Sequence, residues 1–255
     1  MSENSPLFEF DPDPRGVLEP SERFKTGVLP ERLVITFFGV ALQKLLLREA
    51  HSIPVSLQTC GVANAPVSVI ERGGKQVALF HSGVGAPLAG AFFEELIAYG
   101  ARKAMVCGGA GVLDASISQG HLILPTSAVR DEGLSHHYLP AGREVAPGSL
   151  ALAAAEGALL ARQVPYVKGK TWTTDGLYRE TRGKVAARRA AGCLSVEMEA
   201  AAFFAVAQFR GVQCAQFLYG GDDVSGDQWD HRGWDGNFSV QEMLLEVAIE
   251  AVLSF

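Results

Sequence analysis

The 255-residue sequence has few charged residues, few cysteines and no long apolar run, and each shortage excludes a class of protein. Charged residues make up 20% of the chain, and 22 basic against 28 acidic residues give a formal net charge of −6. Disordered chains carry more charge and fewer apolar residues than the 48% found here. Proteins that bind nucleic acids or membrane surfaces carry a basic excess, so the sequence predicts neither partner.

No apolar run approaches the roughly 18 residues that a membrane-spanning helix needs. The start, MSENSPLFEFDPDPR, is acidic and interrupted by proline, so we expect no signal peptide. The four cysteines are far apart and form no Cys-x-x-Cys pair. We expect buried free thiols in a reduced cytoplasm rather than disulfides or metal ligands. These cysteines are Cys60, Cys107, Cys193 and Cys214.

Strand-like and helix-like segments alternate along the chain, which predicts an α/β protein whose sheet carries helices on both faces. The expected strands are 33–38, 66–71, 76–80, 103–107, 121–124, 166–171, 194–196 and 214–219. The expected helices are 40–50, 87–99, 149–162, 180–191, 198–210 and 239–253. Five prolines in residues 1–32 predict an extended N-terminal arm. No linker or repeat divides residues 33–255, so we expect one domain there.

Glycine is more frequent than usual, at 28 of 255 residues, and it gathers after three of the expected strands. These segments are 82–87, 108–111 and 220–223. Ligands of open α/β sheets gather beyond the carboxyl ends of strands, and glycine lets the backbone approach them closely. We therefore expect ligand contacts from Gly83, Gly85, Gly108 and Gly109, with simple tight turns as the alternative.

Two common nucleotide motifs are missing from these glycine segments. The first segment lacks the third glycine of a dinucleotide-binding loop at the required offset, and no acidic residue follows on the next expected strand. A phosphate-binding P-loop is excluded because Gly-Lys-Ser/Thr does not occur in the sequence.

Several motifs resemble those of the nucleoside phosphorylase/nucleosidase superfamily, which includes purine nucleoside phosphorylases, uridine phosphorylases and methylthioadenosine nucleosidases. Ser82–Pro87 resembles the first motif, and Gly108–Gly111 with the following Gly120–Ile123 resembles the second. The segment 129–136 is similar to its counterpart in uridine phosphorylases. The most specific match is Val196–Ala202 (Val-Glu-Met-Glu-Ala-Ala-Ala), followed by Asp222-Asp223.

The resemblance runs from about Leu33 to the C-terminus and implies a fold and an activity. The implied fold is a three-layer αβα sandwich around a mixed, partly barrel-like sheet, in a protein that forms homo-oligomers such as dimers or hexamers. The implied reaction is cleavage of the N-glycosidic bond of a nucleoside. We expect phosphorolysis, with phosphate as co-substrate, which yields the free base and a pentose 1-phosphate. No metal or other cofactor is expected.

Glu199 is the residue expected to hold the ribose. It opens a helix directly after a buried strand, where a carboxylate can accept strong bonds from two ribose hydroxyls. The resemblance implies that Met198 packs on the sugar ring. Glu197 is either a substrate contact or a negative charge that favours the start of the helix.

Asp223 is the residue expected to help a purine leave, by giving a proton to N7 of the base or bonding with it. Its neighbour Asp222 is a like charge that would raise one of the two pKa values. In the base-pocket loop, Leu177 or Tyr178 could face the base and Arg182 could contact its polar edge. Two alternatives stay open: an acidic, solvated loop and a divalent-metal loop. Both include Asp222, Asp223, Asp227, Asp230 and His231.

The phosphate cradle of the superfamily has no clear counterpart here. Phosphorylases carry a Gly-Asp-Pro-type loop after the first strand, where this sequence has Phe38–Leu42. Val106 and Gly109 occupy the positions of the expected arginine and hydroxyl. A buried phosphate without cationic partners is costly. The carboxylate with which a nucleosidase activates water is also absent, because the loop offers Gln43 and Lys44 instead.

Three hypotheses remain after this comparison. We expect a phosphorylase of purine nucleosides whose phosphate site is rearranged, using Arg130, Arg48 or an arginine of a neighbouring subunit. A nucleoside hydrolase is the second hypothesis. The third is a nucleoside-binding protein that has lost catalysis.

Overall fold

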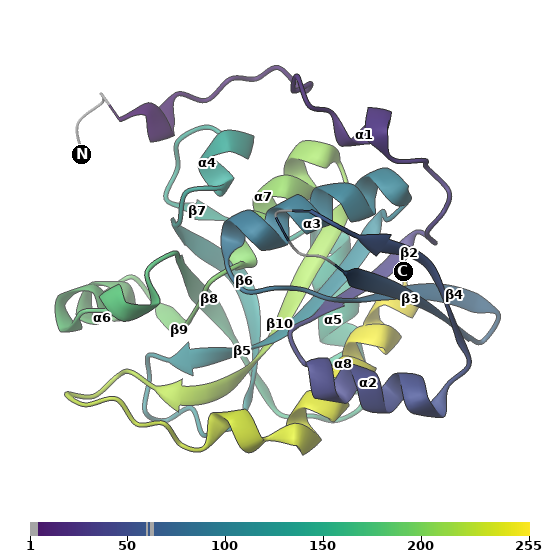
Figure 1. The fold of residues 1–255 in the computed structure, drawn as a ribbon. Coiled ribbons are helices and arrows are strands. Elements are labelled where there is room, and N and C mark those ends of the chain that lie inside the picture. Colours follow the sequence, from purple (N-terminus) through teal and green to yellow (C-terminus); the bar gives the residue numbers. More distant parts are fainter. Residues whose placement is uncertain (1–4, 60, 62–63) are drawn as a thin grey trace.

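The computed structural model describes residues 5–59, 61 and 64–255 and shows a central sheet covered by helices on both faces (Figure 1). The strands are β1 (Arg32–Thr36), β2 (His51–Leu57), β3 (Ala65–Arg72), β4 (Lys75–His81), β5 (Lys103–Val112), β6 (Leu122–Asp131), β7 (Glu144–Val145), β8 (Tyr166–Thr174), β9 (Cys193–Glu197) and β10 (Gln213–Asp223). The α-helices are α1 (Pro20–Arg23), α2 (Gly39–Arg48), α3 (Ala86–Tyr99), α4 (Ser135–Tyr138), α5 (Ser149–Ala161), α6 (Arg182–Ala190), α7 (Ala200–Arg210) and α8 (Phe238–Leu253). Three short 3-10 helices are η1 (Pro6–Phe8), η2 (Leu177–Arg179) and η3 (Trp234–Gly236).

The sheet closes on itself along part of its length. Its strand order is β10-β6-β8-β9-β5-β1-β4-β3-β2, and β10 pairs with β5 as well as with β6. The strands β5, β10, β6, β8 and β9 therefore form a ring. Pairing is mixed, because β1, β4, β5 and β10 run parallel while β9 runs antiparallel to β5. The predicted αβα class with a mixed, partly barrel-like sheet is confirmed.

Apolar side chains fill the space on both faces of the sheet. One core lies under α3 and α7, where the rings of Phe93 and Phe203 meet edge to face with centroids 5.6 Å apart. The other core lies under α5 and α8 and includes Leu159 and Leu244. The described cysteines Cys107, Cys193 and Cys214 are buried free thiols, and Cys60 lies outside the described residues.

Strand β5 is longer than predicted, because it continues through Gly108–Gly111 to Val112 instead of ending at Cys107. Neighbouring strands pack closely on these glycines. A Cβ on Gly109 would lie 3.3 Å from the ring of Tyr219, and a Cβ on Gly111 would lie 3.1 Å from Val196. Glycine here permits close packing within the sheet and does not end the strand.

Strand β6 also departs from the prediction, since Pro125 does not close it. The strand continues to Asp131, and its pairing with β8 shifts register between Pro125 and Ser127. An irregularity of this kind accommodates the missing backbone donor of proline. The edge strand β2, which contains Pro54, was not predicted.

The segment before β1 is mainly extended, as its prolines predict, and it crosses the molecule over α4 and α3 (Figure 1). Phe8 contacts the ring of His136 edge to face at 5.1 Å, and Arg210 pairs with Glu19 at 3.3 Å. In the part of the chain that the structure describes, no helix has the length and apolar character needed to cross a membrane.

Candidate functional site

Glu199 lies between β9 and α7 and is 5% exposed. Its Oε1 accepts a hydrogen bond of 2.5 Å from the backbone N–H of Gly85, the residue that precedes α3. Gly85 has φ +104°, a conformation that glycine adopts readily and other residues do not. The carboxyl group therefore lies where two helices begin, and helix N-termini stabilise negative charge. Burial and then the charge of Glu197 nevertheless raise the pKa of Glu199 to about 8.

Glu197 is 6% exposed and closes the start of α7. Its Oε2 accepts from the backbone N–H groups of Glu199 at 2.8 Å and Ala200 at 2.6 Å. Its Oε1 accepts from the hydroxyl of Thr173 at 2.6 Å. These bonds explain why α7 begins at Ala200 and not at 198 as predicted. Burial raises the pKa of Glu197 to about 7. Its contact with a substrate stays a prediction beside this helix-start role.

The register of β5 and β9 brings Glu199 to the second glycine segment. Gly111 pairs with Val196 in antiparallel orientation, so the chain after Val196 runs back along β5 toward Gly109 and Gly108. Met198 lies on this stretch and is half-buried. Gly108 and Gly109 thus lie on the same part of the sheet as Glu199.

Gly83 belongs to the loop that reaches the same carboxyl group. It precedes Gly85, the donor to Glu199, by two residues. A Cβ on Gly83 would lie 2.4 Å from the side chain of Leu88, so the loop packs tightly on α3.

Asp223 ends β10 and is 7% exposed. Its Oδ1 accepts from the backbone N–H of Ser225 at 2.7 Å, and its Oδ2 forms an ion pair with Arg232. The guanidinium of Arg232 also donates to the carbonyl of Ile117 at 2.8 Å, and the backbone of Asp223 pairs with that of Asp230. Asp223 therefore fastens the segment 224–232 to the end of the sheet. Its predicted catalytic role stays a prediction.

Asp222 has different surroundings, since it is half-buried and its Oδ2 accepts from the indole N–H of Trp229 at 2.6 Å. A Cβ on Gly111 would lie 3.4 Å from Oδ1 of Asp222, so the carboxylate lies against the β5 backbone. The half-buried Glu180 interacts with it. Burial and then the charge of Asp222 raise the pKa of Glu180 to about 7.

The remaining predicted base-pocket residues lie on the surface. Leu177 is 53% exposed and Tyr178 is 94% exposed in η2. Arg182, the first residue of α6, donates to the carbonyl of Asp227 at 2.8 Å. The structure thus ties Arg182 to the segment after β10, and Leu177 and Tyr178 have room to meet a ligand.

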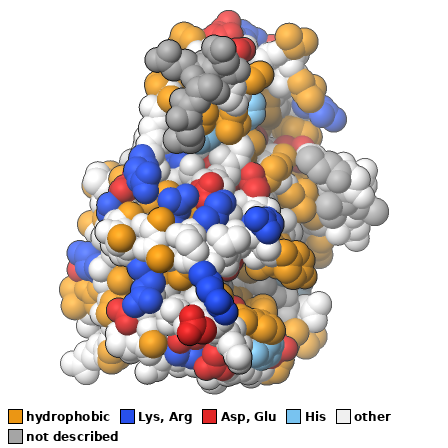
Figure 2. Space-filling view, turned by 90° about the vertical axis from the view of Figure 1, so that its left-hand side faces the viewer, with side chains coloured by type: hydrophobic (Ala, Val, Ile, Leu, Met, Phe, Trp, Pro, Cys, Tyr) orange, Lys and Arg blue, Asp and Glu red, His pale blue; other side chains and the backbone are white. Residues whose placement is uncertain are grey.

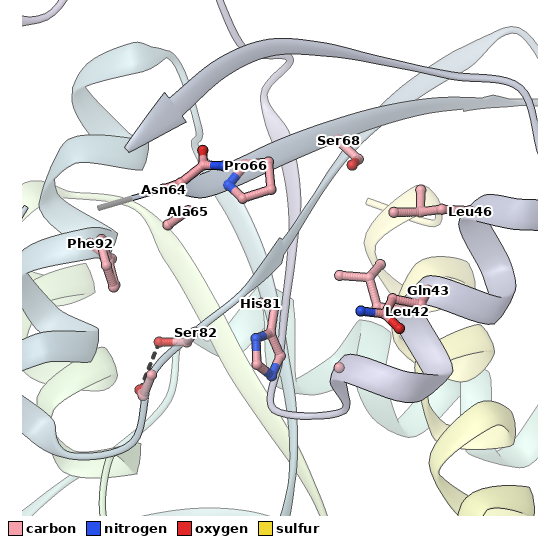
Figure 3. Close-up of a pocket in the computed structure, with 12 residues that line it drawn as sticks. Leu42, Gln43, Leu46, Asn64, Ala65, Pro66, Ser68, His81, Ser82 and Phe92 are labelled. Carbon is pink, nitrogen blue, oxygen red and sulfur yellow. Dashed lines mark hydrogen bonds between the residues drawn. The ribbon is translucent and has the colours of Figure 1, made fainter. Parts of the chain in front are cut away.

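A cavity of about 380 Å³ opens beside the first glycine segment, between α2 and the ends of β3 and β4 (Figure 3). It is lined by Gly39, Leu42, Gln43, Leu46, Asn64, Ala65, Pro66, Ser68, His81, Ser82, Gly83 and Phe92. Gly83 connects it to the loop that holds Glu199. The described residues that line it include no Lys, Arg, Asp or Glu.

The arginines considered for a phosphate are not among the described residues that line the cavity. Arg130 is 8% exposed and donates to Ser135, Leu139 and Pro140, and burial lowers its pKa. Arg48 ends α2, two positions beyond the lining residue Leu46. Within the described ranges, no group of three or more His, Cys, Asp or Glu side chains is placed to hold a metal ion.

Sequence reasoning did not single out Trp229, Arg232, Thr173 or Glu180, although Glu180 and Thr173 lie in the predicted base-pocket segment. The interactions of Trp229 and Arg232 join residues seven and nine positions apart across an irregular segment. No periodicity in the sequence signals such contacts.

Comparison with known proteins gives a consistent result. The sequence model of the Phosphorylase superfamily matches residues 32–254. A guanosine phosphorylase of Halorubrum lacusprofundi is 30% identical over 170 residues, which cover 66% of this chain and 69% of that one. A uridine phosphorylase of Treponema pallidum is 30% identical over 191 residues, covering 69% and 72%.

Two solved structures share the fold. An AMP nucleosidase from Bacteroides thetaiotaomicron superimposes with a TM-score of 0.72 at 22% identity, covering 89% of this chain and 88% of that one. A uridine phosphorylase from Vibrio fischeri gives a TM-score of 0.74 at 21% identity, covering 89% and 93%. At these identities the likeness concerns the arrangement of the elements.

Proposed function

The chain belongs to the Phosphorylase superfamily, and on that premise we propose that it cleaves the N-glycosidic bond of a nucleoside. The observation that carries this proposal is the buried carboxyl group of Glu199, held by the N–H of Gly85 where α3 and α7 begin. A carboxylate has about four acceptor positions, so one bond to Gly85 leaves capacity for the two adjacent hydroxyls of a ribose.

Glu199 acts on a developing cation in its ionised form, which its pKa of about 8 makes the major form only above that pH. When the bond to the base breaks, positive charge grows on the sugar, and this charge interacts more favourably with an ionised Glu199 than the neutral ground state does. The resulting stabilisation is greatest in the transition state and therefore accelerates the reaction. The half-buried Met198 would contact the sugar ring.

The leaving base needs a proton, and the contacts favour Asp222 as its source. Asp223 was the predicted donor, but Arg232 balances its charge and its two oxygens are engaged. Asp222 is more exposed and interacts with Glu180, whose pKa is raised to about 7 by burial and then by the charge of Asp222. Glu180 therefore retains a proton near neutral pH next to Asp222. A proton held there suits N7 of a purine.

The nucleophile that attacks the sugar is either water or phosphate. Phosphorolysis was the first expectation, yet a phosphate dianion needs cations, and the described lining of the cavity supplies none. We therefore place hydrolysis ahead of phosphorolysis. Phosphorolysis stays the second candidate, because the guanosine phosphorylase and the uridine phosphorylase that are each 30% identical to this chain carry that activity in their names. It would require an arginine from a neighbouring subunit in a homo-oligomer.

The test is a panel of purine and pyrimidine nucleosides incubated with and without phosphate, with base and sugar products separated by chromatography. Hydrolysis predicts free pentose and a rate that ignores phosphate. Phosphorolysis predicts pentose 1-phosphate and no turnover without phosphate. Release of no base from any nucleoside would contradict the proposed function and favour the binding protein.

A further inference from the structure

Among the described residues that line the cavity beside the first glycine segment, His81 is the one with a titratable side chain. It is the last residue of β4, and its Nε2 would lie 3.2 Å from a Cβ on Gly39. The imidazole therefore occupies the space that the glycine at the start of α2 leaves free. Figure 3 shows the ring between the end of β4 and the start of α2, with Gln43 one turn further along the helix.

The other polar groups of the cavity cannot act as bases. Gln43, Asn64 and Ser68 carry amides or a hydroxyl, which hold a water molecule by hydrogen bonds but do not accept its proton near neutral pH. The hydroxyl of Ser82 donates to the carbonyl of Gly83 at 3.0 Å and so bonds to its own loop. No other described residue that lines the cavity is titratable.

His81 is also close in the chain to the group that would hold the ribose. Gly85, whose N–H donates to Glu199, follows His81 by four positions, so the backbone spans at most about 14 Å between them. Gly83 lines the cavity between these points. A pentose held by Glu199 would therefore lie within the length of this loop from the cavity.

We propose that His81 is the general base of hydrolysis, taking a proton from the water molecule that attacks the anomeric carbon. The water oxygen forms a bond to this carbon while the bond to the base nitrogen breaks. The electron pair of the broken bond leaves with the base, which receives a proton from the Asp222–Glu180 pair. His81 then returns its proton to solvent, and the carboxyl pair is reprotonated from solvent. The amide of Gln43 holds the attacking water against the imidazole.

This assignment rests on the proposed hydrolysis and is tested with His81→Gln, which keeps a hydrogen-bonding side chain but removes the base. We expect kcat for base release to fall about 10²-fold or more, the usual range for a general base, while the Kd of the nucleoside stays within about twofold. The matched control is His51→Gln on the exposed strand β2, which should leave kcat unchanged.

A second variant tests the same idea by chemical rescue. In His81→Ala, added imidazole should restore part of the lost kcat because it supplies a base to the vacated space. Full activity of His81→Gln, or loss of kcat in His81→Ala that imidazole does not restore, would refute the role of His81. The nucleoside panel with the wild-type protein tests the proposed hydrolysis separately from the role of His81. Turnover that depends on phosphate would reject hydrolysis, and the absence of turnover would reject cleavage of the N-glycosidic bond.

Discussion

Replacing Glu199 with glutamine should raise the stability of the protein at high pH and lower its turnover. The variant keeps the size of the side chain and an oxygen for the N–H of Gly85, but removes the ionisable group. A carboxyl group whose folded pKa is about 8 against an ordinary value of 4.5 destabilises the folded state once it must ionise. The unfolded chain releases this proton near pH 4.5 while the folded chain retains it until about pH 8.

The direction in which the unfolding free energy changes with pH follows from this difference in pKa. The unfolding free energy of the wild type should fall as the pH rises from about 4.5 to 8, and then level off. A rise of about 3.5 pKa units corresponds to an upper limit of roughly 5 kcal/mol. The bond from Gly85, which favours the ionised form, already contributes to this pKa. We therefore expect Glu199→Gln to be more stable than the wild type at pH 9 by up to roughly 5 kcal/mol, and similar in stability at pH 4.5.

Urea unfolding at pH 4.5 and pH 9 measures this difference, with Glu71→Gln, an exposed carboxyl on β3, as the matched control. Turnover measured on the pH 9 samples should fall about 10- to 150-fold, because Glu199 is ionised at that pH and a neutral amide loses about 1.5–3 kcal/mol of charge-assisted bonding to the sugar hydroxyls. A variant that is less stable than the wild type at both pH values would refute the reasoning about burial. A variant with normal kinetics would remove Glu199 from the site.

The remaining predictions concern the end of β10 and the first glycine segment. Asp222→Asn should lower kcat on purine nucleosides about 10²-fold, whereas Asp223→Asn should mainly lower the melting temperature, because it removes one of the two ion pairs of Arg232 at a cost of about 1.5–3 kcal/mol; the reverse pattern would return the acid role to Asp223. Glu180→Gln should change the basic limb of the kcat profile, because it removes a carboxyl group whose pKa is about 7, and an unchanged limb would exclude Glu180 from the proton transfer. Gly85→Ala should lower stability by about 1–3 kcal/mol in thermal unfolding, since alanine is strained at φ +104°, and equal melting temperatures would contradict this.

The layers of the fold could be predicted from alternating strands and helices, but the extent of individual strands could not. Gly108–Gly111 and Pro125 are typical of strand ends, and both lie inside strands here. Partners distant in the sequence decide these cases: Tyr219 and Val196 pack on the glycines of β5. Such packing depends on the closed ring, which local sequence does not encode.

The candidate site could be predicted only in part, because some of its contacts also depend on partners outside the local motif. Glu199 could be singled out from a local motif, whereas its bond to the N–H of Gly85 was found only in the structure. The choice between Asp222 and Asp223 depends on which way each carboxylate faces at an irregular strand end. Trp229 and Arg232 settle those directions from a segment without regular structure.

The double pairing of β10 has a consequence for how the chain folds. Gln213 pairs with Lys103, 110 positions earlier in the sequence, so ring closure joins the most recently synthesised strand to one made much earlier. At about 5–20 residues per second, a ribosome makes that intervening stretch in roughly 6–22 s. During this interval β5 and β6 lack a partner on one side and expose free backbone groups to other chains. The core that contains α7 and the apolar side chains of β5 is therefore completed only when β10 pairs with β5. Contacts between residues so far apart in the sequence form slowly, which makes this the slow step of folding.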